Sequence, residues 1–124
     1  MSRFSPAQVV ERTGFSLDTL RYYERIGLLD GIARTPGGQR VFSDDDIAWL
    51  GILRCLRDTG MPIAQMQRYA DLCRDDTTMA ERLALLEEHD REVQRRIDEL
   101  QAQRVHLAGK MDYYRSLDTR SATA

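Results

Sequence analysis

The sequence predicts a mostly α-helical protein with one small β-hairpin, and three observations support this prediction. Only three prolines interrupt the 124 residues, and none lies between residues 79 and 117, so long helices are allowed. Residues that favour helix starts and helix stops alternate along the first part of the chain. One strong turn signal, Pro36-Gly37-Gly38, separates two short runs that have the character of strands.

The first two predicted helices are short and close together. Ser5 is a favourable N-cap for the first helix, and Gly14 favours its end. Ser16 and Gly27 play the same two parts in the second helix. Ser5 is also followed by proline at the first helical position and glutamine at the third, which is the pattern of a capping box. Two short helices joined by a few residues that include glycine match a helix-turn-helix.

A hairpin and two further helices are predicted next. Residues 32–35 and 39–42, on either side of the turn, predict two short strands; a hairpin beside a helix-turn-helix is called a wing. Ser43 caps a third helix whose first turn holds three aspartates, where the helix dipole favours anions. Gly60 ends this helix, and Pro62 starts a fourth.

The last third of the chain predicts one long helix with an apolar stripe. Two rows at heptad spacing contain Leu83, Leu86, Val93, Ile97, Leu100, Leu107, Met111 and Tyr114. The helix would extend about 60 Å at 1.5 Å per residue, more than the preceding residues can cover. We therefore expect the stripe to pair with a second copy of the chain. Asp90 and Arg104 interrupt the stripe, and we expect them to pair across an antiparallel dimer and fix its register.

Composition excludes several classes of protein. No apolar run approaches the roughly 20 residues of a transmembrane helix, and the N-terminus lacks a secretory signal, so we expect a cytoplasmic protein. Cys55, Cys73, His89 and His106 form no zinc or disulfide pattern, so we expect no metal, no cofactor and reduced thiols. The net charge is -2, yet arginines gather between residues 21 and 40, and binding depends on the local potential.

The second predicted helix has two different faces. At about 100° per residue, one arc contains Leu17, Leu20 and Tyr23, and the opposite arc contains Asp18, Arg21, Tyr22 and Arg25. The two adjacent tyrosines therefore point in different directions. A face of arginine and tyrosine on this helix suits the major groove of DNA, because arginine bridges guanine edges and both residue types hold phosphates. The alternative is a charged face that contacts only solvent.

The segments RTGFSLDTLRYYERIGLL and RTPGGQRVFSDDDIAWLGILRCLRDTGMPI closely resemble the N-terminal domain of the MerR family of bacterial transcription regulators. This resemblance implies a winged helix-turn-helix with two further helices and a long C-terminal antiparallel coiled-coil dimerisation helix. The expected domains are a DNA-binding domain at 1–77, a dimerisation helix at 78–118 and a flexible tail at 119–124.

The resemblance also implies a function and a set of DNA contacts. Members bind pseudo-palindromic promoter operators as homodimers and distort the DNA for RNA polymerase, which implies a regulator and not an enzyme. The expected partners are double-stranded DNA, a second copy of the chain and RNA polymerase. Contacts implied by matching positions are Ser16, Asp18, Thr19, Arg21, Tyr22 and Tyr23 near the second helix and Arg34, Gln39 and Arg40 in the wing, while Arg25 joins them from the polar arc.

Cys55 lies five residues before Gly60, as in the thiol-type subgroup of the family that responds to aldehydes and other electrophiles and lacks a large effector domain. By this resemblance Cys55 is a thiol sensor for a small electrophile, with Arg54 and Arg57 favouring the thiolate. A small buried apolar cysteine is the alternative for this residue. For the whole protein, the alternatives are an effector-independent repressor or architectural protein and a coiled-coil interaction adaptor.

Overall fold

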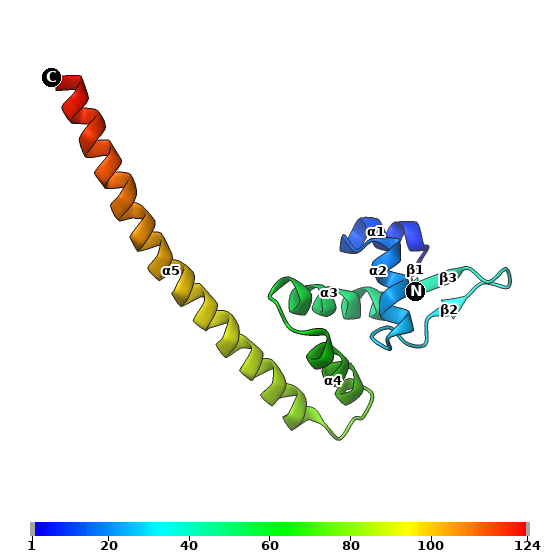
Figure 1. The fold of residues 1–124 in the computed structure, drawn as a ribbon. Coiled ribbons are helices and arrows are strands. Elements are labelled where there is room, and N and C mark those ends of the chain that lie inside the picture. Colours follow the sequence, from blue (N-terminus) through cyan, green and yellow to red (C-terminus); the bar gives the residue numbers. More distant parts are fainter. Residues whose placement is uncertain (1, 124) are drawn as a thin grey trace. The chain divides into compact units, whose positions relative to one another are not determined.

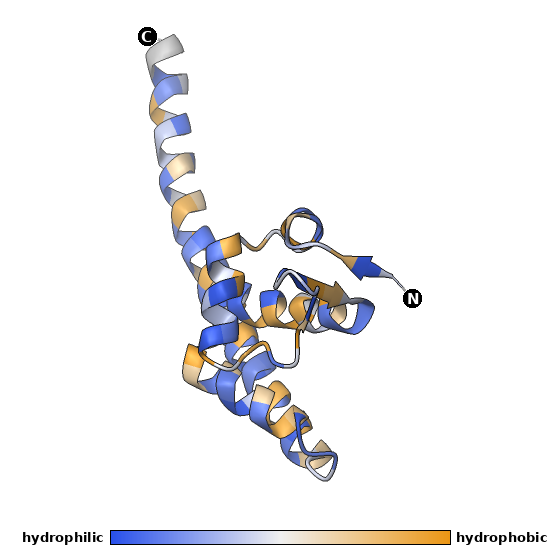
Figure 2. Ribbon diagram, turned by 90° about the vertical axis from the view of Figure 1, so that its right-hand side faces the viewer, coloured by the Kyte–Doolittle hydropathy of each residue, from blue (hydrophilic) through white to orange (hydrophobic). Residues whose placement is uncertain are grey.

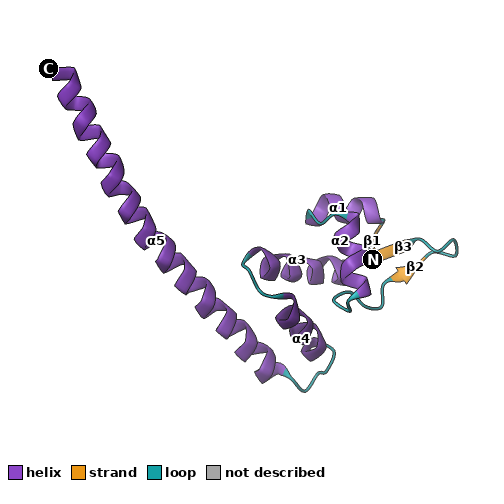
Figure 3. Cartoon of the chain, viewed as in Figure 1, coloured by secondary structure: helices purple, strands orange, loops and turns teal. Residues whose placement is uncertain are grey.

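The computed structural model describes residues 2–123, and helices form most of it (Figures 1 and 3). The elements in chain order are β1 (Arg3–Phe4), α1 (Pro6–Thr13), α2 (Leu17–Arg25), β2 (Ala33–Arg34), β3 (Arg40–Ser43), α3 (Asp44–Asp58), α4 (Ile63–Cys73) and α5 (Met79–Thr123). The predicted fold class is confirmed: a helix-turn-helix and a wing are followed by two helices and one long helix.

Side-chain caps set the beginnings of the short helices, as predicted. The Ser5 hydroxyl accepts a hydrogen bond from the Gln8 amide at 3.3 Å, and the Gln8 side chain accepts from the Ser5 amide at 2.8 Å. Ser43 and Asp46 form the same reciprocal pair at the start of α3, with bonds of 2.9 and 3.1 Å. The chain leaves α1 through Gly14, whose φ of 77° is a conformation that glycine adopts without strain.

The described strands form one three-stranded sheet with β3 in the middle. β2 and β3 are the predicted wing hairpin, and Arg34 lies opposite Arg40 in the last pair before the turn. The edge strand β1 pairs with the other side of β3 and places Phe4 opposite Phe42. β1 was not predicted from the sequence, because two residues are too few to show an alternating pattern.

The hydrophobic core of the N-terminal part receives side chains from all four of its helices. Its largest fully buried side chains are Phe15, Phe42, Leu28, Leu50, Leu53, Met66 and Val9. Burying a large apolar side chain stabilises a fold by about 1.5–3 kcal/mol before the cost of ordering the chain. The buried hydroxyl of Thr13 donates to the Val9 carbonyl at 2.7 Å and accepts from the Phe15 amide at 3.3 Å, so it is satisfied.

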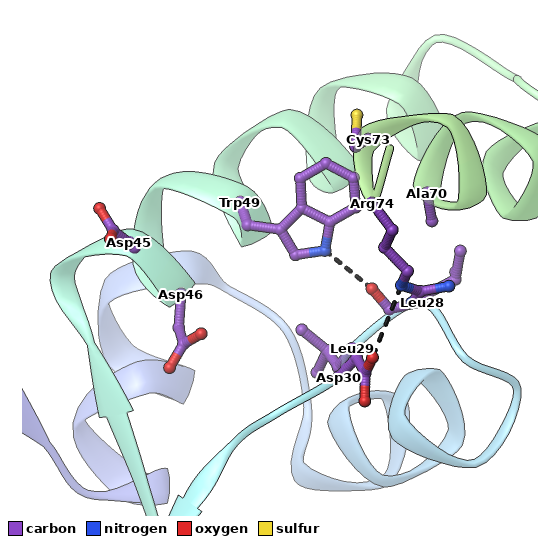
Figure 4. Close-up of a pocket in the computed structure, with 9 residues that line it drawn as sticks. All are labelled: Leu28, Leu29, Asp30, Asp45, Asp46, Trp49, Ala70, Cys73 and Arg74. Carbon is purple, nitrogen blue, oxygen red and sulfur yellow. Dashed lines mark hydrogen bonds and ion pairs between the residues drawn. The ribbon is translucent and has the colours of Figure 1, made fainter. Parts of the chain in front are cut away.

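α3 and α4 pack beside the segment that follows α2. The indole of Trp49 stacks on the ring of Tyr69 with centroids 5.7 Å apart. The indole Nε1 donates to the Leu28 carbonyl at 2.7 Å (Figure 4). Arg74, which follows α4, forms an ion pair with Asp30 at 3.6 Å. Together these contacts fix the path of the chain as it leaves α2 for the wing.

The described chain divides into two compact units, one ending at Leu85 and the other beginning at Leu86, and α5 runs from the first into the second. Hydrophobic and hydrophilic stretches alternate along α5 (Figure 2). The helix reaches Thr123, so residues 119–123 are helical where a flexible tail was expected. This difference has a local cause, because no proline or glycine follows residue 109 to interrupt the helix. None of the described helices has the length and apolar character needed to cross a membrane.

Candidate nucleic-acid interface

The outer side of α2 presents the polar residues that helical periodicity predicts. Asp18, Arg21 and Tyr22 are exposed, and Arg21 forms an ion pair with Asp18 at 3.5 Å while its side chain stays 56% exposed. Arg25 is also exposed, and its guanidinium lies 5.6 Å from the centroid of the Tyr22 ring, a cation–π contact. These four side chains form one polar surface, which we call the α2 face.

Burial separates the two adjacent tyrosines. Tyr22 is 38% exposed, whereas Tyr23 is only 2% exposed. The Tyr23 ring packs edge-on against Phe15, with centroids 5.4 Å apart. Burial raises the pKa of the Tyr23 phenol, and the neighbouring Arg57 guanidinium opposes this rise. Tyr23 therefore anchors α2 to the core, while Tyr22 is accessible from outside.

Two further predicted residues lie where α2 begins. The Ser16 hydroxyl accepts from the Thr19 amide at 3.1 Å and donates to the Thr19 hydroxyl at 3.0 Å. Ser16 is exposed and Thr19 is half-buried. Both side chains therefore serve the N-cap of α2, at the end of the helix where the dipole attracts anions such as phosphate.

In the wing, two predicted arginines converge on a carboxylate that was not predicted. Oε1 of Glu24, in α2, accepts from Nε and Nη2 of Arg40 at 3.1 and 2.9 Å and from Nη2 of Arg34 at 3.1 Å. Arg34 also donates to the Gly38 carbonyl at 3.1 Å, and the predicted Gln39 is exposed in the turn. Sequence spacing gave no signal for this cluster, because Glu24 and Arg40 are separated by 16 positions.

The ion-pair cluster is sensitive to acid. The hydrogen bond from Arg40 lowers the pKa of the Glu24 carboxyl below its ordinary value of 4.5, and the charges of Arg40 and Arg34 add to this effect. The resulting stability is present above pH 4.5 and is lost as the pH falls through the lower pKa of the folded state. Partly exposed pairs of this kind contribute on the order of 1 kcal/mol or less.

Pairing of β1 with β3 adds a third arginine beside the wing. A depression of ≈ 360 Å³ lies between β1 and the hairpin, and Arg3, Arg34 and Arg40 all line it. The protein is slightly acidic as a whole, so this gathering of arginines is a local feature. Arg3 was not among the predicted site residues, since only the pairing of β1 places it there.

Cys55 is exposed on α3, so the alternative of a buried, packed cysteine is wrong for the chain as described. The two arginines beside it are engaged by other groups. Arg54 donates to the Thr13 carbonyl and pairs with Asp58 at 3.3 Å, and Arg57 pairs with Asp58 at 3.0 Å. We expected both arginines to stabilise a Cys55 thiolate, but their contacts are with the Thr13 carbonyl and the Asp58 carboxylate.

Cys73 lies at a different place, in a pocket of ≈ 340 Å³ between α3, α4 and the segment after α2 (Figure 4). Cys73 is half-buried. Burial raises the pKa of the Tyr69 phenol, and the neighbouring Cys73 side chain raises it further. Within residues 2–123, no three His, Cys, Asp or Glu side chains are grouped so that they could hold a metal ion.

The apolar stripe of α5 lies open along the helix. Leu83, Ile97, Leu100, Leu107, Met111 and Tyr114 are exposed, and Leu86 and Val93 are half-buried. Asp90 and Arg104 are exposed within the same stripe. An exposed apolar surface of this length is characteristic of a protein–protein contact.

Comparisons with known proteins agree with this geometry. Residues 4–73 match the family model described as MerR HTH family regulatory protein, and residues 47–110 match the model described as MerR, DNA binding. A Haemophilus influenzae protein, described as an uncharacterized HTH-type transcriptional regulator, is 37% identical over 112 residues, which are 90% of this chain and 83% of that protein.

Two further relatives are similar over different shares of their length. The HTH-type transcriptional regulator AdhR of Bacillus subtilis is 36% identical over 87 residues, which are 68% of this chain and 62% of AdhR. The crystal structure of HiNmlR, described as a MerR family regulator lacking the sensor domain and bound to promoter DNA, has a TM-score of 0.84 and 35% identity. That comparison covers 93% of this chain and 92% of the other.

The different burial of the two tyrosines predicts different effects of substitution. Tyr22→Phe removes an exposed hydroxyl, so we expect DNA affinity to fall by about fivefold, the value of one hydrogen bond, with little change in melting temperature. Tyr23→Ala empties a core position and should cost about 3 kcal/mol of stability as well. Thermal unfolding and DNA titration of both variants test this difference, and equal losses of melting temperature would contradict it.

Proposed function

Because the chain belongs to the MerR family of helix-turn-helix regulatory proteins, we propose that it binds a pseudo-palindromic promoter operator as a homodimer and distorts the DNA. Its family makes it a DNA-binding transcriptional regulator, and its relatives are regulators, which suggests that it is not an enzyme. The observation that carries the proposal is the exposed α2 face beside a buried Tyr23. DNA lies in the cytoplasm of bacteria, so the proposal places the protein there.

We propose that α2 enters the major groove and that the wing contacts the adjacent backbone. Arg21 is long enough and exposed enough to reach guanine edges or phosphates, and the Tyr22 hydroxyl suits a phosphate oxygen. The N-cap of α2 offers further donors to the backbone. The proposed contacts are Ser16, Asp18, Thr19, Arg21, Tyr22 and Arg25 from α2 and its cap, with Arg34, Gln39 and Arg40 from the wing. The contact expected from Tyr23 is not among them, because its side chain is buried in the core.

The second part of the proposal concerns the dimer. The exposed stripe of α5 would be covered by the same stripe of a second copy, running antiparallel. Arg104 lies two heptads after Asp90, and Ile97 lies midway between them. A two-fold axis near Ile97 would therefore bring Asp90 of each helix close to the partner's Arg104, giving two ion pairs.

Such a dimer suits a promoter. Its two-fold symmetry would match the symmetry of a pseudo-palindrome, with one α2 face for each half-site. A dimer that holds both half-sites can bend or untwist the DNA between them. This deformation would change the relative position of the two promoter elements that RNA polymerase binds. HiNmlR, the structural neighbour bound to promoter DNA, supports the promoter as the target.

We further propose that Cys55 makes the regulator responsive to small electrophiles. Exposure of Cys55 supports this role because an electrophile can reach the sulfur. The contacts of Arg54 and Arg57 with Asp58 do not support a strongly activated thiolate. An effector-independent repressor or architectural protein is the alternative with the same DNA face, whereas a coiled-coil adaptor would not bind DNA.

Replacing Arg21 tests the DNA face. We expect Arg21→Ala to weaken binding to the promoter region of the protein's own gene by about tenfold and to reduce the salt slope by about one, because one arginine contact is lost. Arg68→Ala, at an exposed position of α4, removes the same charge outside the face and should change neither quantity. DNA binding that survives Arg21→Ala unchanged would indicate a different DNA-binding surface, and no DNA binding by the unaltered protein would favour the adaptor.

Exchanging charges tests the antiparallel register. Asp90→Arg alone and Arg104→Asp alone each place like charges together, so we expect the dimer to dissociate about tenfold more readily, an effect of about 1.4 kcal/mol. The double exchange should restore the dimer, because it recreates opposite charges. Sedimentation equilibrium measures the dissociation constants, and a double variant as weak as the single ones would rule out this pairing.

Replacing each cysteine tests the thiol response. In a promoter-reporter strain treated with formaldehyde, methylglyoxal or diamide, we expect Cys55→Ser to abolish the response because no nucleophilic sulfur remains at that position. Cys73→Ser, in the half-buried pocket, is the matched control and should keep the response. A full response from Cys55→Ser would disprove the thiol proposal, and no response from the unaltered protein would support an effector-independent regulator.

A further inference from the structure

One carboxylate oxygen joins the last turn of α2 to both strands of the wing. Oε1 of Glu24 accepts two hydrogen bonds from Arg40, at 3.1 and 2.9 Å, and one from Arg34, at 3.1 Å. The two arginines lie opposite each other in the last pair of the hairpin before the turn. Glu24 of α2 therefore binds both strands of the wing at the position where the hairpin turn begins.

The hairpin turn of the wing is stabilised by hydrogen bonds between residues of the wing itself. The Thr35 amide donates to the Gln39 carbonyl at 2.7 Å, and Arg34 donates to the Gly38 carbonyl at 3.1 Å. All the hydrogen bonds that the structure describes for residues 35–39 stay inside the wing. The position of the turn relative to α2 thus depends on the cluster at Glu24.

The same carboxylate reduces the positive charge that the wing offers to DNA. Arg34 and Arg40 carry two positive charges, and Glu24 offsets one of them at hydrogen-bond distance. The Arg40 side chain is only 25% exposed, while that of Arg34 is 47% exposed. A phosphate approaching either guanidinium would also be repelled by the carboxylate, since both lie well within a screening length of about 8–10 Å.

We infer that Glu24 is a positioning residue that makes DNA binding selective, by holding the wing beside α2 and weakening its attraction for unmatched DNA. On a matched site, contacts from α2 bring the backbone to a wing that is already ordered, so Arg34 and Arg40 bind with less loss of freedom. On unmatched DNA, binding comes from charge alone, and the carboxylate opposes it. The inference rests on the proposed DNA interface.

Glu24→Gln in the full chain tests the inference, because the amide keeps the size and an accepting oxygen but removes the charge. One duplex is obtained by repeated selection of random DNA on the unaltered protein, and a second duplex carries its shuffled sequence. We expect affinity for the shuffled duplex to rise about fivefold and its salt slope to steepen by about 0.9, the value of one more phosphate contact. Affinity for the selected duplex should change by less than about twofold.

Two further variants separate position from charge. Asp76→Asn removes one exposed carboxylate from the segment between α4 and α5, outside the interface, and should leave the selectivity unchanged. Glu24→Asp keeps the charge on a shorter side chain and should bind the shuffled duplex almost as weakly as the unaltered protein does. Fluorescence anisotropy gives the affinities, and thermal unfolding establishes that each variant is folded.

The inference is overturned if Glu24→Gln and Asp76→Asn change both affinities by the same factor. It is also overturned if folded Glu24→Gln loses affinity for both duplexes, since Glu24 would then only support the wing. Failure of the proposed interface is seen separately. If Arg21→Ala leaves binding of the selected duplex unchanged, the interface is wrong and the inference falls with it.

Discussion

The rest of the DNA-binding part depends on the packing of Tyr23 against Phe15 and on the burial of Leu20 beside it in α2. α2 has only nine residues, and a helix this short is marginal in water without tertiary contacts. Because its inner side is fixed in the core, the helical geometry directs Arg21 and Tyr22 outward. The same burial therefore stabilises the helix and creates the surface that we propose for DNA.

The wing shows a second dependence of function on packing. A hairpin whose first strand has two residues is too small to be stable alone. It gains support from β1 on one side of β3 and from Glu24 at the turn. This support uses Arg34 and Arg40, the residues that would otherwise be the wing's strongest attraction for phosphate. Structural and DNA-binding roles thus compete for the same guanidinium groups.

α5 differs from the N-terminal part because its apolar side chains are not buried within one chain. Its helical backbone satisfies its own hydrogen bonds, but most of the stripe from Leu83 to Tyr114 is exposed to water. A second copy would cover it, and Asp90 and Arg104 would then select one alignment among several that heptad spacing allows. The dimer and its register are proposals, whereas the exposed stripe is a property of the folded chain.

The local features of this protein follow from its sequence patterns. Caps at Ser5 and Ser43, the wing hairpin, the heptad stripe and the opposite directions of the two tyrosines depend on residues a few positions apart. Three other features became known from the folded chain: the pairing of β1 with β3, the convergence of two arginines on Glu24 and the exposure of Cys55. The first two join residues far apart in the chain, and the third depends on which distant segments pack beside α3, so no spacing or periodicity encodes them.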